Sequence, residues 1–110
     1  MTREAARAQL DEVATEFLQQ PDVDWGRIFG STGLRVRGKV FAVANHAGEL
    51  MVKIPEQRAD ELVGDGTARR MAMRGREMRE WVTMPVEAGA DSWRDLVGEA
   101  YRYLDEITPR

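Results

Sequence analysis

With 110 residues and no cysteine, the chain is long enough for one domain with a single hydrophobic core and can form neither disulfides nor thiolate metal sites. Its net charge of −3 favours a soluble protein and argues against a general binder of polyanions. The longest apolar run has five residues, against roughly 20 in a membrane helix, and the charged N-terminus lacks the apolar core of a signal peptide, so we expect a cytoplasmic protein without membrane contact.

The first predicted element is an amphipathic helix that begins at Thr2 and ends near Gln19. Thr2 is a suitable N-cap, and Pro21 cannot continue a helix. Between them, apolar residues recur at the spacing of one helical face: Ala6, Leu10, Val13, Ala14, Phe17 and Leu18.

Alternating apolar and polar residues predict strands at 34–36 and 50–54, and the apolar run 40–44 predicts another between them. Gly38 and residues 45–48, Asn-His-Ala-Gly, predict the hairpin turns that join these strands. Such short connections require antiparallel pairing, because a parallel crossover takes a dozen residues or more.

The segment Gly30-Ser31-Thr32-Gly33 invites comparison with a phosphate-binding loop. That loop needs Lys-Ser/Thr and a helix after its glycines, whereas a strand is expected to follow here. We therefore predict a tight turn between strands, in which glycine supplies positive φ or close backbone approach.

Pro55 suits a first helical position and predicts a short helix that ends at Gly64. Residues 67–76 show no clean period, so no element is predicted there. Residues 78–84 predict one more strand of the same sheet, which Pro85 ends.

The last predicted element is a helix capped by Asp91 or Ser92 and ended by Pro109. Its apolar stripe consists of Trp93, Leu96, Val97, Ala100, Leu104 and Ile107. The chain is therefore predicted to be a single α+β domain over residues 1–110, an antiparallel sheet flanked by N- and C-terminal helices with a short helix inserted.

Four short segments carry a family resemblance through their order along the chain. They are Ile28-Phe29-Gly30-Ser31-Thr32-Gly33-Leu34, Gly38-Lys39-Val40-Phe41-Ala42, Met51-Val52-Lys53-Ile54-Pro55 and Met78-Arg79-Glu80-Trp81-Val82. Over roughly residues 13–104 the chain resembles the TfoX/Sxy N-terminal domain family. The resemblance implies a secretion-chaperone-like fold, also seen in the related YjbR-like proteins.

Full-length members of that family act in natural competence with the cyclic-AMP receptor protein and carry a second, C-terminal domain, for which this chain has no room. Family members also often have a proline and an aromatic residue where this sequence has Ala68-Arg69-Arg70-Met71. The resemblance supplies no catalytic residues, and fold alone does not imply function.

Charge is divided along the chain. Residues 1–24 and 80–110 each carry a net −4, and residues 25–79 a net +5. If Met78, Val82 and Met84 point inward, Glu80 must do so too, and Trp81 then faces outward with Arg79. This predicts a basic sheet face with an aromatic platform, as used for single-stranded nucleic acids. The candidate residues are Arg35, Arg37, Lys53, Arg69, Arg70, Arg74, Arg76, Arg79 and Trp81.

Other candidate residues point to structure rather than chemistry. His46 is the only histidine, so it lacks partners for a metal site or a nucleophile triad, and we predict an exposed turn residue. The acidic side chains are expected on solvated helix faces. The methionines and tryptophans are expected mainly in the core, the alternative being an adaptable binding groove.

The sequence thus predicts a non-enzymatic regulatory or adaptor domain that binds a protein partner or a second copy of itself. The alternative is a nucleic-acid binder that uses the basic face. No cofactor, metal or small-molecule substrate is implied.

Overall fold

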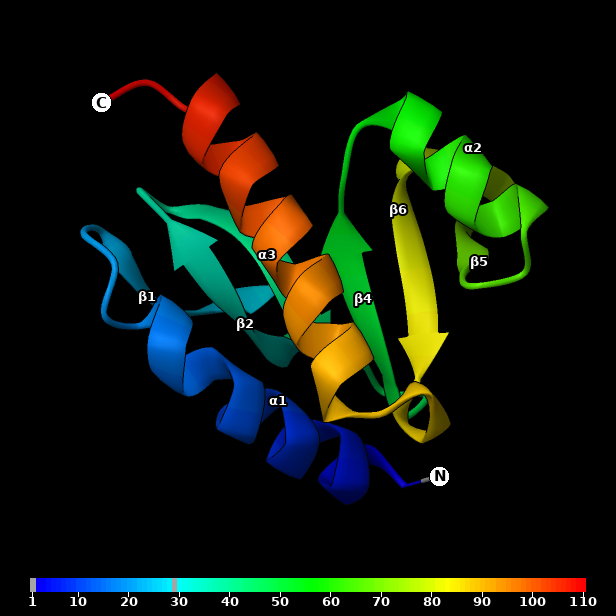
Figure 1. Ribbon diagram of the computed structural model, residues 1–110, viewed down its shortest axis with the longest axis horizontal. Helices are drawn as coiled ribbons and strands as arrows, with labels where there is room; N and C mark the ends of the chain where they lie inside the picture. Colours follow the sequence, from blue (N-terminus) through cyan, green and yellow to red (C-terminus); the bar gives the residue numbers. More distant parts are fainter. Residues whose placement is uncertain (1, 29) are drawn as a thin grey trace.

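Three helices pack on one face of a six-stranded antiparallel sheet (Figure 1). The computed structural model describes residues 2–28 and 30–110. The strand order is β1-β2-β3-β4-β6-β5, and every neighbouring pair is antiparallel. The elements are α1 (Arg3–Phe17), β1 (Val23–Ile28), β2 (Ser31–Val36), β3 (Lys39–Ala44), β4 (Glu49–Lys53), α2 (Glu56–Gly64), β5 (Arg69–Met73), β6 (Arg76–Pro85), a 3-10 turn (Val86–Ala88) and α3 (Ala90–Ile107). The predicted fold class is confirmed.

The core lies between the sheet and the two long helices. In Figure 1, α3 crosses the middle of the sheet and α1 lies beside it. The centre is occupied by Leu10, Phe41 and Trp93, which are all fully buried. The Trp93 indole N–H also donates to the Pro85 carbonyl oxygen at 2.9 Å, which ties the start of α3 to the end of β6. No described helix is long and apolar enough to cross a membrane.

The start of α1 agrees with the sequence prediction, whereas the start of α3 differs from it. Thr2 caps α1 as predicted, and its hydroxyl accepts a hydrogen bond from the Ala5 N–H at 3.1 Å. The last helix begins at Ala90, before both predicted caps. Gly89, with φ of +93°, follows the 3-10 turn and directs the chain straight into α3. Asp91 therefore lies in the first helical turn.

Two strands were not predicted, and one predicted turn is too long. Both β1 and β5 are edge strands with mostly half-buried or exposed residues, so neither has an apolar alternation. Ser31–Gly33 lie in β2 and pair with β1, so the predicted turn 30–33 is wrong in extent, although the chain does reverse between Ile28 and Ser31. Phe29 lies outside the described residues.

Gly33 is required by close packing between β2 and β3. A Cβ atom there would lie 2.7 Å from the Val43 Cγ2 and 2.8 Å from the Ala42 carbonyl oxygen. We expect Gly33→Ala to lower the free energy of unfolding by about 1–3 kcal/mol, because backbone and a buried side chain must move. Gly64→Ala is the matched control, since its Cβ meets no atom within 4 Å. Urea unfolding of the two variants should separate them, and equal midpoints would contradict this packing argument.

Candidate functional site

The register of the sheet assigns each side chain to one of two faces. One row across the sheet faces the helices and consists of Trp25, Leu34, Ala42, Val52, Val82 and Arg70. The next row faces away and consists of Gly26, Gly33, Val43, Met51, Thr83 and Arg69. We call these the helix face and the open face. The predicted basic face would have to be the open face, because helices cover the other one.

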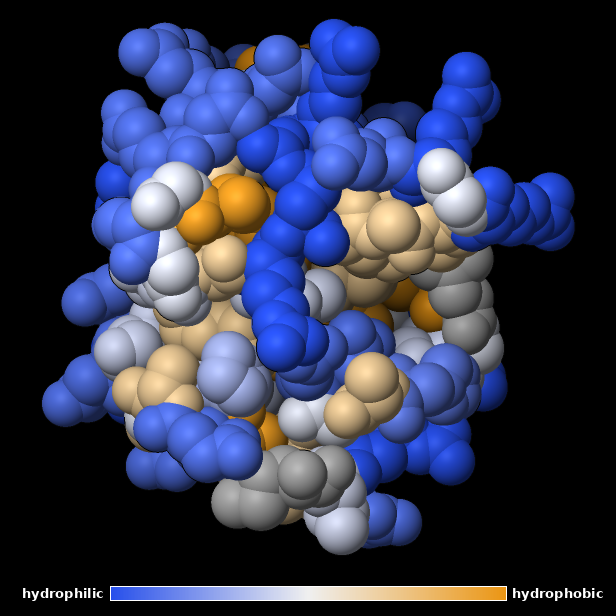
Figure 2. All heavy atoms as spheres, turned by 90° about the vertical axis from the view of Figure 1, so that its right-hand side faces the viewer, coloured by the Kyte–Doolittle hydropathy of each residue, from blue (hydrophilic) through white to orange (hydrophobic). Residues whose placement is uncertain are grey.

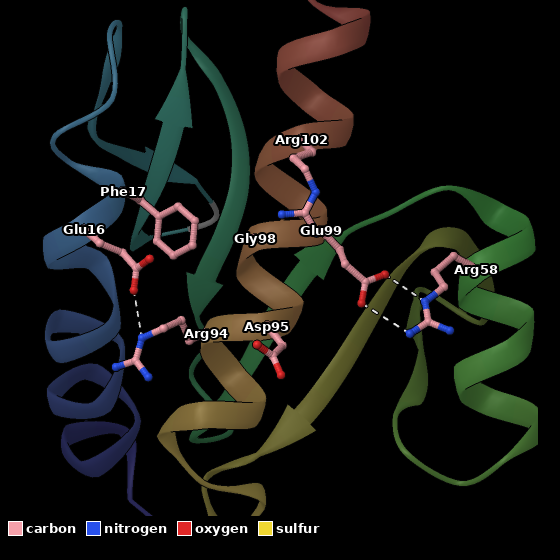
Figure 3. Close-up of a pocket in the computed structure, with 8 residues that line it drawn as sticks. All are labelled: Glu16, Phe17, Arg58, Arg94, Asp95, Gly98, Glu99 and Arg102. Carbon is pink, nitrogen blue, oxygen red and sulfur yellow. Dashed lines mark hydrogen bonds and ion pairs between the residues drawn. The ribbon is translucent and has the colours of Figure 1, made fainter.

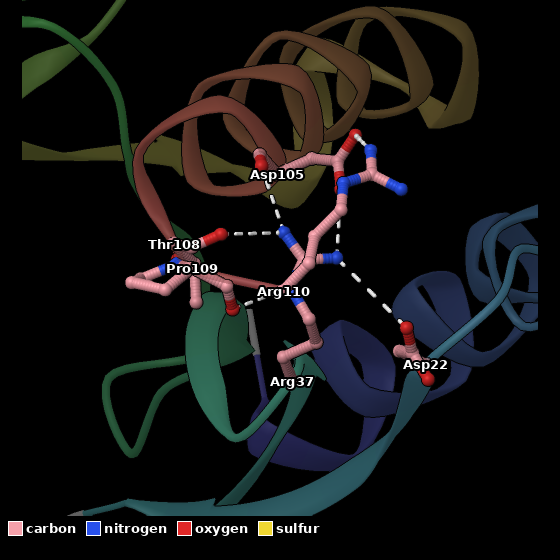
Figure 4. A network of polar contacts seen from close by, with 6 residues as sticks. All are labelled: Asp22, Arg37, Asp105, Thr108, Pro109 and Arg110. Carbon is pink, nitrogen blue, oxygen red and sulfur yellow. Dashed lines mark hydrogen bonds and ion pairs between the residues drawn. The ribbon is translucent and has the colours of Figure 1, made fainter.

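Arg37 does not belong to the open face, which corrects its predicted placement (Figure 4). It lies in the β2–β3 turn with φ of +48°, and its side chain is only 13% exposed. The guanidinium donates to the Asp105 carboxylate at 2.9 Å and to the carbonyl oxygens of Asp105 (2.8 Å), Thr108 (2.9 Å) and Pro109 (3.1 Å). Arg37 therefore caps the C-terminus of α3, where carbonyls lack helical partners.

Arg70 also points away from the open face. Its position in the register is opposite Val82, on the helix face. There the guanidinium pairs with Asp60 of α2 and donates to the Arg79 carbonyl oxygen at 2.6 Å. The predicted binding residue Arg70 thus joins α2 to β6.

Four more of the predicted residues remain accessible, but three of them have acidic neighbours. Arg35 lies across Gly26 and forms a bidentate pair with Asp24, and this pair holds the pKa of Asp24 below its usual value. Two longer ion pairs join Arg79 to the Glu56 carboxylate at 3.7 Å and Lys53 to the Glu80 carboxylate at 3.8 Å. Trp81 is half-buried beside Lys53.

Three predicted arginines stay exposed and form no ion pair with any residue that the structure describes: Arg69, Arg74 and Arg76. All three belong to the hairpin of β5 and β6. Among the predicted binding residues, the unpaired arginines therefore lie together at one edge of the sheet.

The sequence left open which face of β6 is buried, and the structure decides this at Glu80 and Trp81. The Tyr103 hydroxyl of α3 donates to Glu80, so Glu80 faces the helices and Trp81 the other side. This hydrogen bond, with a smaller contribution from burial, raises the pKa of Tyr103 to about 12.

The raised pKa of Tyr103 predicts a pH dependence. The neutral phenol is favoured in the fold, so its contribution to stability is present below about pH 10 and is lost as the pH rises from about 10 through about 12. Glu80→Gln should lower the pKa of Tyr103, measured by tyrosinate absorbance with Tyr103→Phe as the control. An unchanged titration in Glu80→Gln would contradict this assignment.

An apolar hollow opens on the open face of the sheet, and the sequence did not predict it. We call it the open-face hollow; its volume is about 250 Å³. Its lining consists of Ile28, Ser31, Val43, Asn45, His46, Ala47, Met51, Met71 and Met73. Seen from the side of α2 and β5, tan and orange apolar atoms lie set back between blue hydrophilic side chains (Figure 2).

The walls of the open-face hollow come from segments far apart in the sequence. Val43 and Met51 are neighbours across β3 and β4 and are almost fully buried, at 1% and 3% exposed. Met71 and Met73 are half-buried on β5, whereas Met84 packs in the core. The expectation that methionines fill the core is thus confirmed for Met84, whereas Met51, Met71 and Met73 border this hollow.

The turn between β3 and β4 closes one end of the open-face hollow. His46 is exposed there, as predicted, and Arg3 of α1 hydrogen-bonds to its Nδ1. Asn45 fixes the turn by accepting a hydrogen bond from the Glu49 N–H at 2.9 Å. Among the described residues, no group of three or more His, Asp or Glu side chains could hold a metal ion.

A larger groove of about 670 Å³ runs over α3 between α1 and α2 (Figure 3). Its charges neutralise one another: Arg94 pairs with Glu16 at 2.8 Å, and Arg58 pairs with Glu99 at 2.7 Å. The hydrogen bonds that Arg58 donates to Glu99 and, with a smaller effect, to Glu61 raise the pKa of Arg58. The groove side chains therefore connect the helices to each other, and the paired charges favour no ligand of either sign.

Comparisons with known proteins give one match. No curated protein and no solved structure matches the chain significantly. The YjbR family model matches residues 18–103, which include the whole sheet, α2, the residues of the open-face hollow and most of α3. The match therefore covers well over half of the sequence, and this chain belongs to the YjbR family.

Proposed function

We propose that this chain is a non-catalytic regulatory or adaptor domain that binds another protein through the open-face hollow. The observation that carries the proposal is the hollow itself, an apolar depression beside exposed arginines of the β5–β6 hairpin. Apolar side chains surrounded by a polar rim are typical of protein interfaces. The likeness to the TfoX/Sxy N-terminal domain and the cysteine-free sequence support a regulatory role in the cytoplasm.

The size and lining of the open-face hollow favour protein side chains as its occupants. Its volume of about 250 Å³ is below the roughly 300–1,000 Å³ of pockets that enclose a drug-sized ligand. Three of its lining residues, Met51, Met71 and Met73, have flexible, polarisable side chains that adapt to different partners. A partner could therefore insert a few apolar side chains here.

Site-directed photo-crosslinking tests this proposal. A photoreactive amino acid at position 71 should give an adduct in cells with one defined protein, whereas the same amino acid at exposed Arg102, on the helix side, should not. The captured protein must then bind the purified chain, and Met71→Glu must weaken that binding much more than Met71→Leu. Adducts no stronger at position 71 than at position 102 would rule the proposal out.

A second candidate function is nucleic-acid binding, favoured by Arg69, Arg74 and Arg76, which are exposed and unpaired among the described residues. Three phosphate contacts would give a log–log salt slope of about −2 for single strands. Titration of labelled single- and double-stranded DNA at two salt concentrations measures this slope. Absence of binding at low salt would exclude the candidate.

A further inference from the structure

We infer that the partner of the open-face hollow is an extended, acidic segment of another protein that pairs with edge strand β5 and inserts two apolar side chains, two residues apart. This inference rests on the proposed function and adds the conformation and charge of the occupant. It combines three observations: an unpaired sheet edge beside the hollow, the spacing of Met71 and Met73, and unpaired positive charge on the same hairpin.

Strand β5 offers its free edge next to the hollow. It is the last strand of the sheet, and β6 is the only strand that pairs with it among the described residues. An edge strand presents unpaired N–H and C=O groups that can accept another strand. The opposite edge strand, β1, contributes only its last residue, Ile28, to the hollow and carries acidic Asp24.

The β5–β6 turn indicates which backbone groups are free. Arg74 and Gly75 form a two-residue turn with φ of +55° and +75°, which is typical of a type I′ hairpin. In such a hairpin the flanking pair, Met73 and Arg76, shares hydrogen bonds. The N–H and C=O of Ala72 then point away from β6, toward the position of an added strand.

The methionines of β5 set the spacing of the occupant's side chains. Met71 and Met73 are two residues apart and both line the open-face hollow. Successive side chains of a strand alternate between faces, so residues i and i+2 lie on one face, about 6.6–7 Å apart. A strand added beside β5 would place two such side chains next to these methionines, which line the same hollow as Val43 and Met51.

Charge selects an acidic partner over a second copy of this chain. Between Arg69 and Arg79 the hairpin carries five arginines and one glutamate. Pairing of β5 with β5 of another copy would bring two strongly positive hairpins together, which is unfavourable. Aspartate and glutamate beside the two apolar residues would instead pair with Arg69, Arg74 or Arg76, and salt would weaken the contact.

A designed peptide tests the inference by NMR. It contains a Leu-Thr-Leu core with two glutamates on each side, and it is added to the full chain labelled at the methionine methyl groups and backbone amides. We expect the methyl signals of Met51, Met71 and Met73 to shift while that of core Met84 stays unchanged. Amide exchange should slow at Ala72, and a peptide with lysine flanks should bind at least about tenfold more weakly.

Backbone methylation of the peptide separates strand pairing from simple insertion of side chains. N-methyl groups at one alternate set of residues should abolish binding, and N-methyl groups at the other set should leave it nearly unchanged, because only one edge of the peptide would face β5. If both methylated peptides bind equally and still shift the hollow methyl signals, strand pairing is wrong and the hollow remains a docking site.

The remaining outcomes are also decisive. Equal binding by an acidic peptide with a Ser-Thr-Ser core would show that the surface is purely electrostatic, and this would overturn the inference. The same conclusion would follow if the Leu-Thr-Leu peptide shifted no methyl signal and single-stranded DNA displaced it from the arginines. No methyl shift at millimolar peptide would overturn it as well. The proposed function fails separately, if crosslinking at position 71 yields no defined protein.

Discussion

Replacement of Trp93 by alanine is expected to lower the free energy of unfolding by about 3–5 kcal/mol. The side chain is fully buried at the start of α3, where α3 meets the end of β6. Its removal leaves a cavity and also leaves the Pro85 carbonyl oxygen without the indole N–H. Because domains of this size have only about 5–15 kcal/mol of stability, Trp93→Ala would remove a large fraction of it.

Urea unfolding followed by circular dichroism measures this effect through the shift in midpoint. Trp93→Phe is the matched control, because it keeps most of the apolar area and loses the hydrogen bond. It should cost distinctly less than Trp93→Ala. A loss of under about 1 kcal/mol for Trp93→Ala would show that α3 does not depend on this contact.

Replacement of Arg37 by alanine is expected to lower the free energy of unfolding by about 2–3 kcal/mol. Hydrogen bonds that involve a charged group contribute more than neutral ones, and this substitution removes all of those that Arg37 donates. The guanidinium satisfies three carbonyl oxygens and one carboxylate at the end of α3. Arg37→Lys should recover little, because an ammonium cannot reproduce the planar arrangement of donors. The last turn of α3 should lose protection from hydrogen exchange in both variants.

Arg35→Ala provides the control for Arg37→Ala, because Arg35 is two residues away and also forms a bidentate ion pair, with exposed Asp24. Solvent screens this pair, so a much smaller loss of stability is expected. Equal losses of stability for the two variants would show that the contacts of Arg37 with α3 stabilise the fold no more than the exposed ion pair of Arg35 does. Circular dichroism during thermal unfolding is sufficient to compare them.

The same contacts explain why the predicted basic face is only partly realised. Arg35, Arg37 and Arg70 look alike in the sequence, yet each pairs with a different acidic residue. The partner of Arg37, Asp105, lies 68 positions away along the chain. No local sequence pattern predicts such a partner. What remains for binding is the set Arg69, Arg74 and Arg76, beside a hollow whose floor and walls come from five strands and the turn between β3 and β4.

The sequence by itself determined the α+β class, the two long helices and the strands with buried alternation, because periodicity along the chain reflects which face each element buries. It also determined that Trp81 and Glu80 lie on opposite faces. Only the tertiary structure decided that β1 and β5 are strands, since edge strands with polar residues depend on pairing with a neighbour. It likewise decided where Met71 and Met73 lie, because the open-face hollow exists only once β5 is positioned beside the turn of β3 and β4.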